Sequence, residues 1–357
     1  MAVILSARRT AVVPRGGAFA RLSLEQLAVP VVRACLVDAG LTAVDEVICA
    51  NAIGPGGNPA RRIALAAGLP LQVAGLTIDR QCAGGLDAIL LARALVDSGQ
   101  ARLVLAGGAE SYSRRPLRLT TDPDGAQPQP YDQAPFTPWP DRDPGMAEAA
   151  AALAQAEGLS QTDMDAYAVA SHARAMRKTW PEIVPVAGQG RDAFARHLTP
   201  ALAARAKPIC GPITAANAAV AADAAAFCIV AADDLWRSGA LRLLSGATLG
   251  GQPTQPGLAP VAAIGAALAT AGLAPDDLRQ AEVMEAYAAQ AMACITRAGL
   301  PAAIVNPGGG ALSRGHPIGA SGAILAVRLF HDLHQGAGLA AIASAGGIGS
   351  ALVVRRD

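Results

Sequence analysis

The amino-acid sequence predicts a large α/β protein built on a covered, mainly parallel β-sheet. Apolar runs of strand length alternate with helix-length segments along the first 111 residues. Hydrophobic residues make up 52% of the chain and aromatic residues only 3%. Alanine and the branched aliphatic residues must therefore fill the core, as in sheets that are covered on both faces. A chain of 357 residues is also too long for one ordinary core, so we expect two or three domain-sized units.

The strand and helix segments follow one another in a β–α–β order, which is typical of parallel strands joined by crossover helices. We predict strands at residues 2–7, 46–51 and 101–111, and helices at residues 23–40, 60–68 and from just after Cys82 to near Gly99. Proline, aspartate and glutamine then dominate residues 115–145, which predicts a loop. Helical segments follow that loop, and we interpret residues 115–217 as an insertion that rests on the sheet.

Two distant parts of the chain resemble each other. Residues 82–111 and residues 319–350 each contain a turn of small residues, an apolar helix, a glycine break, a strand and a Gly-Gly turn. When Gly85 is aligned with Gly322, the later glycines fall only two positions out of step. We interpret this similarity as an internal duplication of one α/β unit. The alternative is a chance similarity between two alanine-rich helix–strand segments.

The composition argues against several classes of function. Basic and acidic residues number 29 and 28, so the net charge does not favour binding to nucleic acid or to an anionic membrane. The six cysteines are far apart and form no C-x-x-C pair, which argues against disulfide and metal sites and favours a reducing compartment. We find no signal peptide and no apolar run of about 18 residues that would span a membrane. We therefore expect a cytoplasmic protein without a membrane or nucleic-acid partner.

Cys82 is the first candidate for chemistry. It stands directly before a predicted helix and is followed closely by Gly84 and Gly85. A helix N-terminus lowers the pKa of a cysteine and favours the thiolate, and the glycines leave room for a substrate. Free cysteines are, however, often simply buried apolar residues. From these residues alone, a nucleophile and a buried thiol are both open interpretations of Cys82.

His316 is the second candidate. It lies between Gly315 and Pro317, in a glycine-rich loop that leads into a predicted helix. A histidine on a rigid loop beside a helix start is well placed to activate a thiol. Most single histidines are structural, and that interpretation suits the other four in this chain. The glycines before His316 match neither of the common phosphate-binding loop patterns, so a nucleotide site is not expected.

The chain resembles the thiolases over nearly its whole length. The similar segments occur in the family's order: "SARRTAVVPRGGAFA", "NPARRIALAAGLP", "RQCAGGLDAI", "LAGGAES", "DAYAVASHARA", "EIVPV", "ITAANAA", "MEAYAAQA" and "GGALSRGHPIGASGA". The resemblance implies a thiolase fold, with two duplicated halves in a five-layer α-β-α-β-α core and an inserted loop domain. On this basis we expect an N-terminal half at residues 1–114 and 218–249, a loop domain at 115–217 and a C-terminal half at 250–357.

The resemblance also implies roles for particular residues. Cys82 would be the nucleophile that accepts the acyl group, and His316 would lower its pKa and hold the thioester oxygen of the second substrate. The backbone N–H groups of Cys82 and Ala345 would form an oxyanion hole. Ala219, Gly315 and Ser344 would lie at substrate-binding positions. The substrates would be coenzyme A thioesters with no further cofactor and no metal, and the chain would form a homodimer or homotetramer.

Two catalytic positions of the family are replaced. Thiolases carry Asn-Glu-Ala-Phe, whose asparagine holds a water molecule, whereas this chain has Met284 at the asparagine position and Tyr287 at the end of the motif. Thiolases also carry a second cysteine that acts as the acid and base for the carbon–carbon step. Ala343 takes its place in this chain, and Ser344, which follows, is a poor base without assistance. In the coenzyme-binding motif Ala219 replaces a serine, so coenzyme A binding is implied but weakened.

Three hypotheses about function follow. In the first, the protein is a thiolase-like acyltransferase, which forms or cleaves a 3-ketoacyl-CoA. In the second, Cys82 and His316 support acyl transfer or thioester hydrolysis without Claisen condensation. In the third, the chain is a non-catalytic thiolase-fold subunit that works with a partner protein. A positioned acid or base contributes about 10²–10⁴ in rate, so the loss of the second cysteine bears mainly on the first hypothesis.

Overall fold

The computed structural model describes residues 1–357 and is organised on an 11-stranded sheet. Nine strands follow one another in the order β13-β14-β15-β12-β1-β11-β5-β3-β4, and β2 and β8 pair off this path. The strands are β1 (Ala2–Thr10), β2 (Val13–Pro14), β3 (Glu46–Ala50), β4 (Ala74–Ile78), β5 (Leu103–Ser111), β8 (Ile183–Val184), β11 (Ala222–Ala232), β12 (Leu241–Gly250), β13 (Leu278–Val283), β14 (Gly336–Ser344) and β15 (Ile348–Arg356). The predicted α/β class is confirmed.

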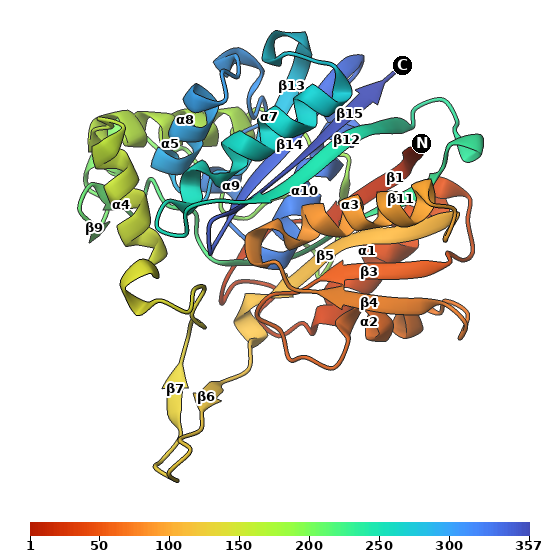
Figure 1. Ribbon diagram of the computed structural model, residues 1–357, viewed down its shortest axis with the longest axis horizontal. Helices are drawn as coiled ribbons and strands as arrows, with labels where there is room; N and C mark the ends of the chain where they lie inside the picture. The colour runs from red at the N-terminus through yellow and green to blue at the C-terminus, as the bar shows by residue number, and fades with distance from the viewer.

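Helices form three layers around the two halves of the sheet, one layer between the halves and one on the outside of each (Figure 1). Helices α3 and α10 pack on each other in the middle and touch strands of both halves, whereas α1 and α2 cover the N-terminal part and α7 and α8 the C-terminal part. These helices are α1 (Leu24–Ala39), α2 (Pro59–Ala67), α3 (Gly84–Asp97), α7 (Ala259–Ala271), α8 (Ala288–Arg297) and α10 (Ile318–Asp332). The resulting order is the predicted α-β-α-β-α arrangement. None of the helices combines the length and the apolar character needed to cross a membrane.

The two central helices approach each other through glycine. A Cβ at Gly85 would lie 2.7 Å from the backbone N of Ala323, and one at Gly322 would lie 2.4 Å from the backbone N of Leu86. The aligned glycines of the duplication therefore allow a reciprocal contact, one from each half. Only glycine permits helix backbones to come this close, and the contact sets the spacing of the middle layer.

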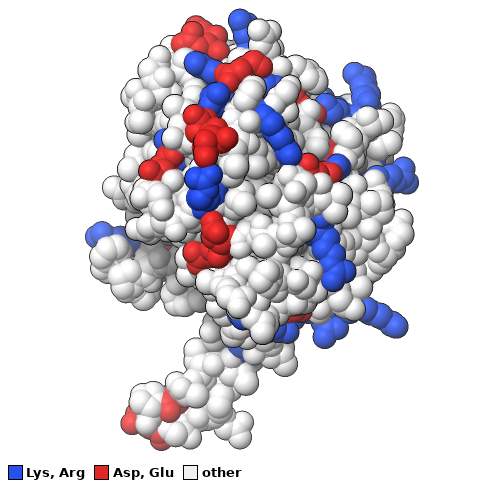
Figure 2. All heavy atoms as spheres, turned by 90° about the vertical axis from the view of Figure 1, so that its right-hand side faces the viewer, with Lys and Arg blue, Asp and Glu red and all other residues white.

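The chain between β5 and β11 forms the insertion. It contains α4 (Met146–Ala156), α5 (Gln161–Met176), α6 (Pro200–Ala204), the β9–β10 pair (Pro208–Cys210 and Ile213–Thr214) and the β6–β7 hairpin (Arg118–Thr120 and Gln129–Tyr131). The hairpin projects from the body in Figure 1. On the face shown in Figure 2, basic and acidic side chains are interspersed, and acidic side chains mark the tip of the hairpin.

The predicted boundaries between the units remain a prediction, with one exception. They assign residues 241–249 to the N-terminal half, but β12 hydrogen-bonds to β15 from Arg242 to Gly250. Only its first residues also pair with β1. The strand therefore lies with the C-terminal half, because its partner along most of its length belongs there.

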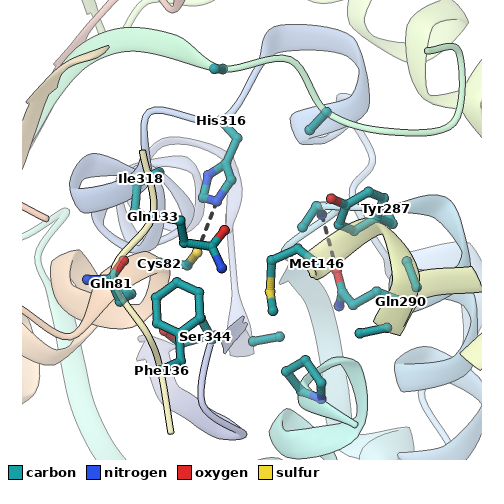
Figure 3. Close-up of a pocket in the computed structure, with 18 of the residues that line it drawn as sticks. Gln81, Cys82, Gln133, Phe136, Met146, Tyr287, Gln290, His316, Ile318 and Ser344 are labelled. Atoms are coloured by element: carbon teal, nitrogen blue, oxygen red, sulfur yellow. Dashed lines mark hydrogen bonds between the residues drawn. The ribbon is translucent and has the colours of Figure 1, made fainter. Parts of the chain in front are cut away.

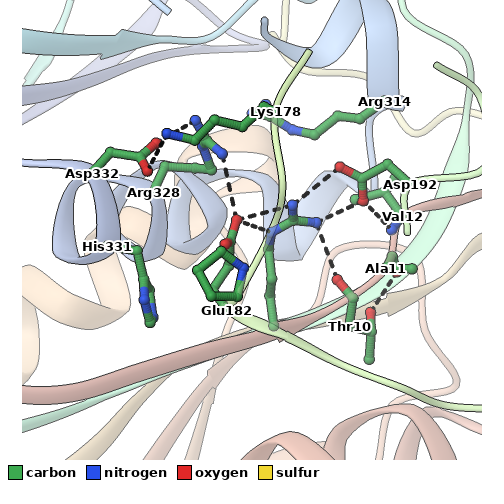
Figure 4. Close-up of polar contacts among 12 residues, drawn as sticks. Thr10, Ala11, Val12, Lys178, Glu182, Asp192, Arg314, Arg328, His331 and Asp332 are labelled. Carbon is green, nitrogen blue, oxygen red and sulfur yellow. Dashed lines mark hydrogen bonds and ion pairs between the residues drawn. The ribbon is translucent and has the colours of Figure 1, made fainter. Parts of the chain in front are cut away.

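Buried charges tie the insertion to the core (Figure 4). The Arg9 guanidinium donates to Asp192 at 2.6 Å and to Glu182 at 3.1 Å, and all three side chains are almost fully buried. Arg328 on α10 reaches the same Glu182 oxygen at 3.4 Å. Because unpaired buried charges are strongly destabilising, this cluster holds residues 182–192 against β1 and α10.

The glycine contact of the middle layer predicts a specific loss of stability. The Gly322→Ala variant should lower the free energy of unfolding by about 1–3 kcal/mol, because the new methyl group has no room beside Leu86. Gly265 in α7 is a matched control, since a Cβ there meets nothing within 4 Å. Gly265→Ala should leave stability unchanged or raise it by about 0.5–1 kcal/mol. Urea unfolding measures both, and equal stability of the two variants would contradict the contact.

Candidate active site

Cys82 sits in a strained turn in front of α3. It belongs to a short 3-10 turn, Gln81–Ala83, and the helix begins at Gly84. Gln81 has a φ of +47°, which is uncommon for a residue other than glycine. The carboxylate of Asp79 holds this conformation by accepting hydrogen bonds from the backbone N–H and the side-chain amide of Gln81, at 2.8 and 2.9 Å. Strain of this kind is common where a side chain must face a functional site.

His316 is fixed by the loop between α9 (Ala311–Arg314) and α10. Gly315 ends α9 with a φ of +109°, in the region that favours glycine, and turns the chain toward the pocket. The backbone N–H of His316 donates to the carbonyl oxygen of Val220 at 2.7 Å. The histidine is therefore anchored to the segment that leads into β11.

The structure brings the two predicted residues together (Figure 3). Nε2 of His316 lies 3.1 Å from Sγ of Cys82, and Nδ1 lies 2.6 Å from Oγ of Ser321. The Ser321 hydroxyl donates to the carbonyl oxygen of Pro317 at 3.2 Å, so it accepts the proton of Nδ1. In a neutral imidazole this arrangement leaves Nε2 as the acceptor, ready for the thiol proton.

Burial controls the charge of both partners. It raises the pKa of the Cys82 thiol to about 12, although the N–H groups of Cys82 and Ala345 lower it. Burial also lowers the pKa of His316 to about 4, and the nearby charge of Arg314 lowers it further. The resting pair is therefore a neutral thiol and a neutral imidazole. The predicted lowering of the Cys82 pKa is wrong for this state, because the loss of hydration outweighs the helix start and the N–H groups.

The backbone N–H of Ala345 also lies beside Cys82. This N–H group and that of Cys82 are both directed at the Cys82 sulfur. Ala345 follows β14, while Cys82 precedes α3, so one donor comes from each half of the fold. Two fixed donors beside the sulfur are the arrangement needed to stabilise a negatively charged oxygen on an atom bonded to it.

A mainly apolar pocket of about 290 Å³ opens from the Cys82–His316 pair. Both halves and the insertion contribute to its wall, and 16 of its 25 lining residues are hydrophobic. In the view of Figure 3, Phe136 of the insertion lies below Cys82, and Met146 lies to its side, with Tyr287 and Gln290 beyond Met146. The pocket therefore suits a substrate with an extended apolar part.

The remaining predicted positions are divided between the pocket and the core. Ala343, Ser344 and Ala219 line the pocket. Met284 is fully buried within the central hydrophobic cluster and is not part of the lining. Gly315 is not part of the lining either, and its contribution is the turn that directs His316.

Sequence reasoning missed the supporting role of Glu110 at the end of β5. This fully buried carboxylate accepts from the Asn51 side chain at 2.7 Å, and from the backbone N–H groups of Ala52 and Gly319, both at 3.0 Å. Burial raises its pKa to about 7. Glu110 thus fixes the first turn of α10, directly after His316, to the loop that follows β3. The only indication of this role in the sequence was an acidic residue at the end of an apolar strand.

Sequence reasoning also missed most of the pocket wall. Gln133, Phe136, Met146 and Leu153 come from the insertion and line the pocket. Their segment has no helical or strand periodicity in its first part, so no pattern indicated which side chains would face Cys82.

Fold and site together define a duplicated α/β protein in which two helix starts bring a cysteine and a histidine into contact. The family model described as "Thiolase, N-terminal domain" matches residues 2–234, and "Thiolase, C-terminal domain" matches residues 240–356. The chain belongs to the thiolase family.

Relatives and solved structures agree with this assignment. YhfS of Bacillus subtilis strain 168 is 38% identical over 371 residues, covering 99% of this chain and 98% of that protein. VraB of Staphylococcus epidermidis is 34% identical over 375 residues, with the same coverage. Both have acetyl-CoA C-acetyltransferase as a provisional name.

Two crystal structures superpose on the whole chain. The Bacillus anthracis acetyl-CoA acetyltransferase has a TM-score of 0.92 at 30% identity, covering 99% of this chain and 98% of its own. The Acat5 thiolase from Ascaris suum, in complex with coenzyme A, also has a TM-score of 0.92, at 29% identity with both chains fully covered, 100% each.

The charge state of His316 predicts the pH dependence of Cys82 acylation. A base with a pKa of about 4 is neutral above that pH, so the acylation rate should stay level down to about pH 5 and fall as the pH approaches 4. Mass spectrometry of the acetyl-CoA reaction at a series of pH values measures this rate, with circular dichroism to monitor folding. A half-maximal rate near the ordinary histidine pKa of 6.5 would contradict the neutral pair.

Proposed function

We propose that the protein is an acyltransferase that moves an acyl group from an acyl-CoA to Cys82, and from there to a second acyl-CoA or to coenzyme A. The observation that carries this proposal is the 3.1 Å contact between Nε2 of His316 and Sγ of Cys82, at the base of an apolar pocket. A nucleophile within hydrogen-bond reach of an oriented base is the arrangement that covalent catalysis requires.

The first half-reaction uses groups that the site contains. The Cys82 thiol proton passes to Nε2 of His316 while the sulfur bonds to the thioester carbonyl carbon. The carbonyl electron pair moves onto oxygen, which the N–H groups of Cys82 and Ala345 stabilise, an effect of about 10²–10³ in rate in other enzymes. The bond to the coenzyme sulfur then breaks, and the departing thiolate takes the proton from His316. The products are acylated Cys82 and free coenzyme A.

The substrate class rests on the pocket and on the relatives. The solved structure of the Acat5 thiolase is a complex with coenzyme A, and this structure matches the whole of the present chain. The apolar wall of the pocket offers contacts for an acyl chain and for the aliphatic part of a pantetheine arm. The acyl-CoA is proposed as the substrate, and Cys82, His316 and the backbone N–H of Ala345 as the catalytic groups.

Acyl transfer or thioester hydrolysis without carbon–carbon bond formation is the second candidate function. Ala343 favours it, because this residue lines the pocket at the position of the family's second cysteine and its methyl group cannot exchange a proton. Met284 adds to the argument, since it packs into the core and offers no amide to the pocket. Both candidate functions share the acylation of Cys82.

The proposal includes a homodimer or homotetramer. Strand β4 ends the sheet and supports this arrangement, because its outer edge has no partner strand. Leu76 on this strand is 38% exposed, and Leu71 just before it is 75% exposed. Exposed apolar residues at a free sheet edge are typical of a surface that pairs with another chain.

Intact-mass spectrometry tests the proposed function. Incubation with acetyl-CoA should add one acetyl group and release one equivalent of coenzyme A, and the addition should disappear in Cys82→Ala. Cys49→Ala is the matched control, because Cys49 is buried away from the pocket and should not affect acetylation. No mass gain on the wild-type protein would overturn the proposal in favour of a non-catalytic subunit. A gain that persists in Cys82→Ala would overturn the choice of nucleophile.

A further inference from the structure

The carbon–carbon step needs a group that exchanges a proton with the α-carbon of acetyl-CoA, and Cys82 and His316 are already engaged with each other. The pocket wall offers few other candidates. Three polar lining residues are amides, which are not proton donors or acceptors at neutral pH: Gln81, Gln133 and Gln290.

The other polar lining residues are also unsuitable, except for two tyrosines. The Ser344 hydroxyl is already engaged as a donor to the backbone oxygen of Arg80 at 3.0 Å. The guanidinium of Arg118 has donors but no acceptor, and Asp132 is an exposed carboxylate held 2.6 Å from Arg115. These groups leave the hydroxyls of Tyr112 and Tyr287 as candidates.

The two tyrosines occupy different parts of the pocket. Tyr112 also lines a neighbouring surface hollow, and the guanidinium groups of Arg15 and Arg115 lie 5.5 and 4.8 Å from its ring centre. It therefore stands at the outer end of the pocket. Tyr287 lines the pocket together with Cys82 and His316 and does not line that hollow. Of the two, Tyr287 is the one that belongs to the Cys82 pocket alone.

The backbone of Tyr287 is rigidly placed. It is the residue directly before α8, and its backbone bridges to Ala218. The next residue, Ala288, donates its N–H to the carbonyl oxygen of Asn217 at 2.9 Å. The side chain is half-buried on the pocket wall, and no side chain or backbone group of the protein hydrogen-bonds to its hydroxyl. Because the hydroxyl is neither bonded to the protein nor sealed from solvent, it is free to meet a substrate in the pocket.

The hydroxyl is also held in its protonated form. Burial raises the Tyr287 pKa to about 12, and the neighbouring Cys82 and Cys210 raise it as well. A neutral phenol can donate a proton to a carbanion-like atom, and the resulting phenolate is a strong base that recovers a proton from an imidazolium.

We propose that the Tyr287 hydroxyl is the acid and base of the carbon–carbon step, in place of the cysteine that Ala343 replaces. This inference rests on the proposed function, since it concerns the reaction of the same pocket. The family motif ends in phenylalanine, which has no hydroxyl. The inference therefore gives a catalytic role to a group that this motif lacks.

The proton transfers balance in the cleavage direction. The Cys82 sulfur bonds to the keto carbon while its proton moves to His316, and the carbon–carbon bond breaks. The electron pair of that bond goes to the α-carbon, which takes the proton of the Tyr287 hydroxyl and leaves as acetyl-CoA. The tyrosinate then takes the proton from the His316 imidazolium, which restores the neutral phenol and the neutral imidazole. Coenzyme A passes its thiol proton to His316 while its sulfur attacks the acyl carbon, and Cys82 departs and takes that proton back. Condensation is the reverse.

The Tyr287→Phe variant removes only the hydroxyl and tests the role. Cleavage of acetoacetyl-CoA by coenzyme A should fall by at least about 10²-fold, while acetylation of Cys82 by acetyl-CoA keeps its rate. Tyr131→Phe, on the hairpin and outside this pocket, is the matched control and should retain both rates. Adding Ala343→Cys to Tyr287→Phe should restore part of the cleavage rate, because a cysteine at that position can again exchange a proton.

The outcomes separate this inference from the proposed function. Equal cleavage rates in wild type and Tyr287→Phe would overturn the inference alone. Acetylation without any cleavage in wild type would also overturn it, and would favour the second candidate function. Loss of Cys82 acetylation in Tyr287→Phe, with an unchanged thermal unfolding midpoint, would assign the hydroxyl to the first half-reaction and contradict a role confined to the carbon–carbon step. No acetylation of wild type would overturn both proposals together.

Discussion

The contact between α3 and α10 is the constraint on which the rest of the structure depends. Cys82 precedes one helix and His316 precedes the other, so the glycine-lined approach of Gly85 and Gly322 sets the distance between sulfur and imidazole. The N-terminal ends of both helices converge at the site. Their dipoles favour a negative charge that forms during reaction and disfavour a proton on His316 before it. The duplication is thus what creates the site, because each half supplies one helix start.

Burial determines the chemistry that this geometry can perform. The same loss of hydration keeps Cys82 protonated, His316 neutral and Tyr287 protonated. None of these groups carries a resting charge, so each proton transfer accompanies bond formation instead of preceding it. The backbone N–H groups at the sulfur then matter most when charge develops, because they are fixed in place beforehand. In such a site a phenol can take over a role that a thiol performs elsewhere, provided that it faces the substrate.

Some of this could be predicted from the sequence and some could not, for physical reasons. The alignment of Gly85 with Gly322 and the choice of Cys82 and His316 as candidates followed from ordered motifs, and the structure brings each pair together. The direction of the Cys82 pKa shift did not, because helix position is visible in a sequence and desolvation is not. The side on which β12 pairs depends on long-range hydrogen bonds to β15, which local periodicity does not indicate. Likewise, the pocket residues of the insertion belong to loops, where side-chain direction is set by tertiary contacts.

The central claim is that the Cys82–His316 pair is neutral in the free protein. The ultraviolet absorbance of thiolate, taken as the difference between wild type and Cys82→Ala across a pH titration, tests it most directly. With the Cys82 pKa raised to about 12 by burial, the difference spectrum should show no thiolate at neutral pH and should grow only in strongly alkaline solution. A thiolate signal that is already complete at neutral pH, and that disappears on acidification, would contradict the account and indicate a preformed thiolate–imidazolium pair.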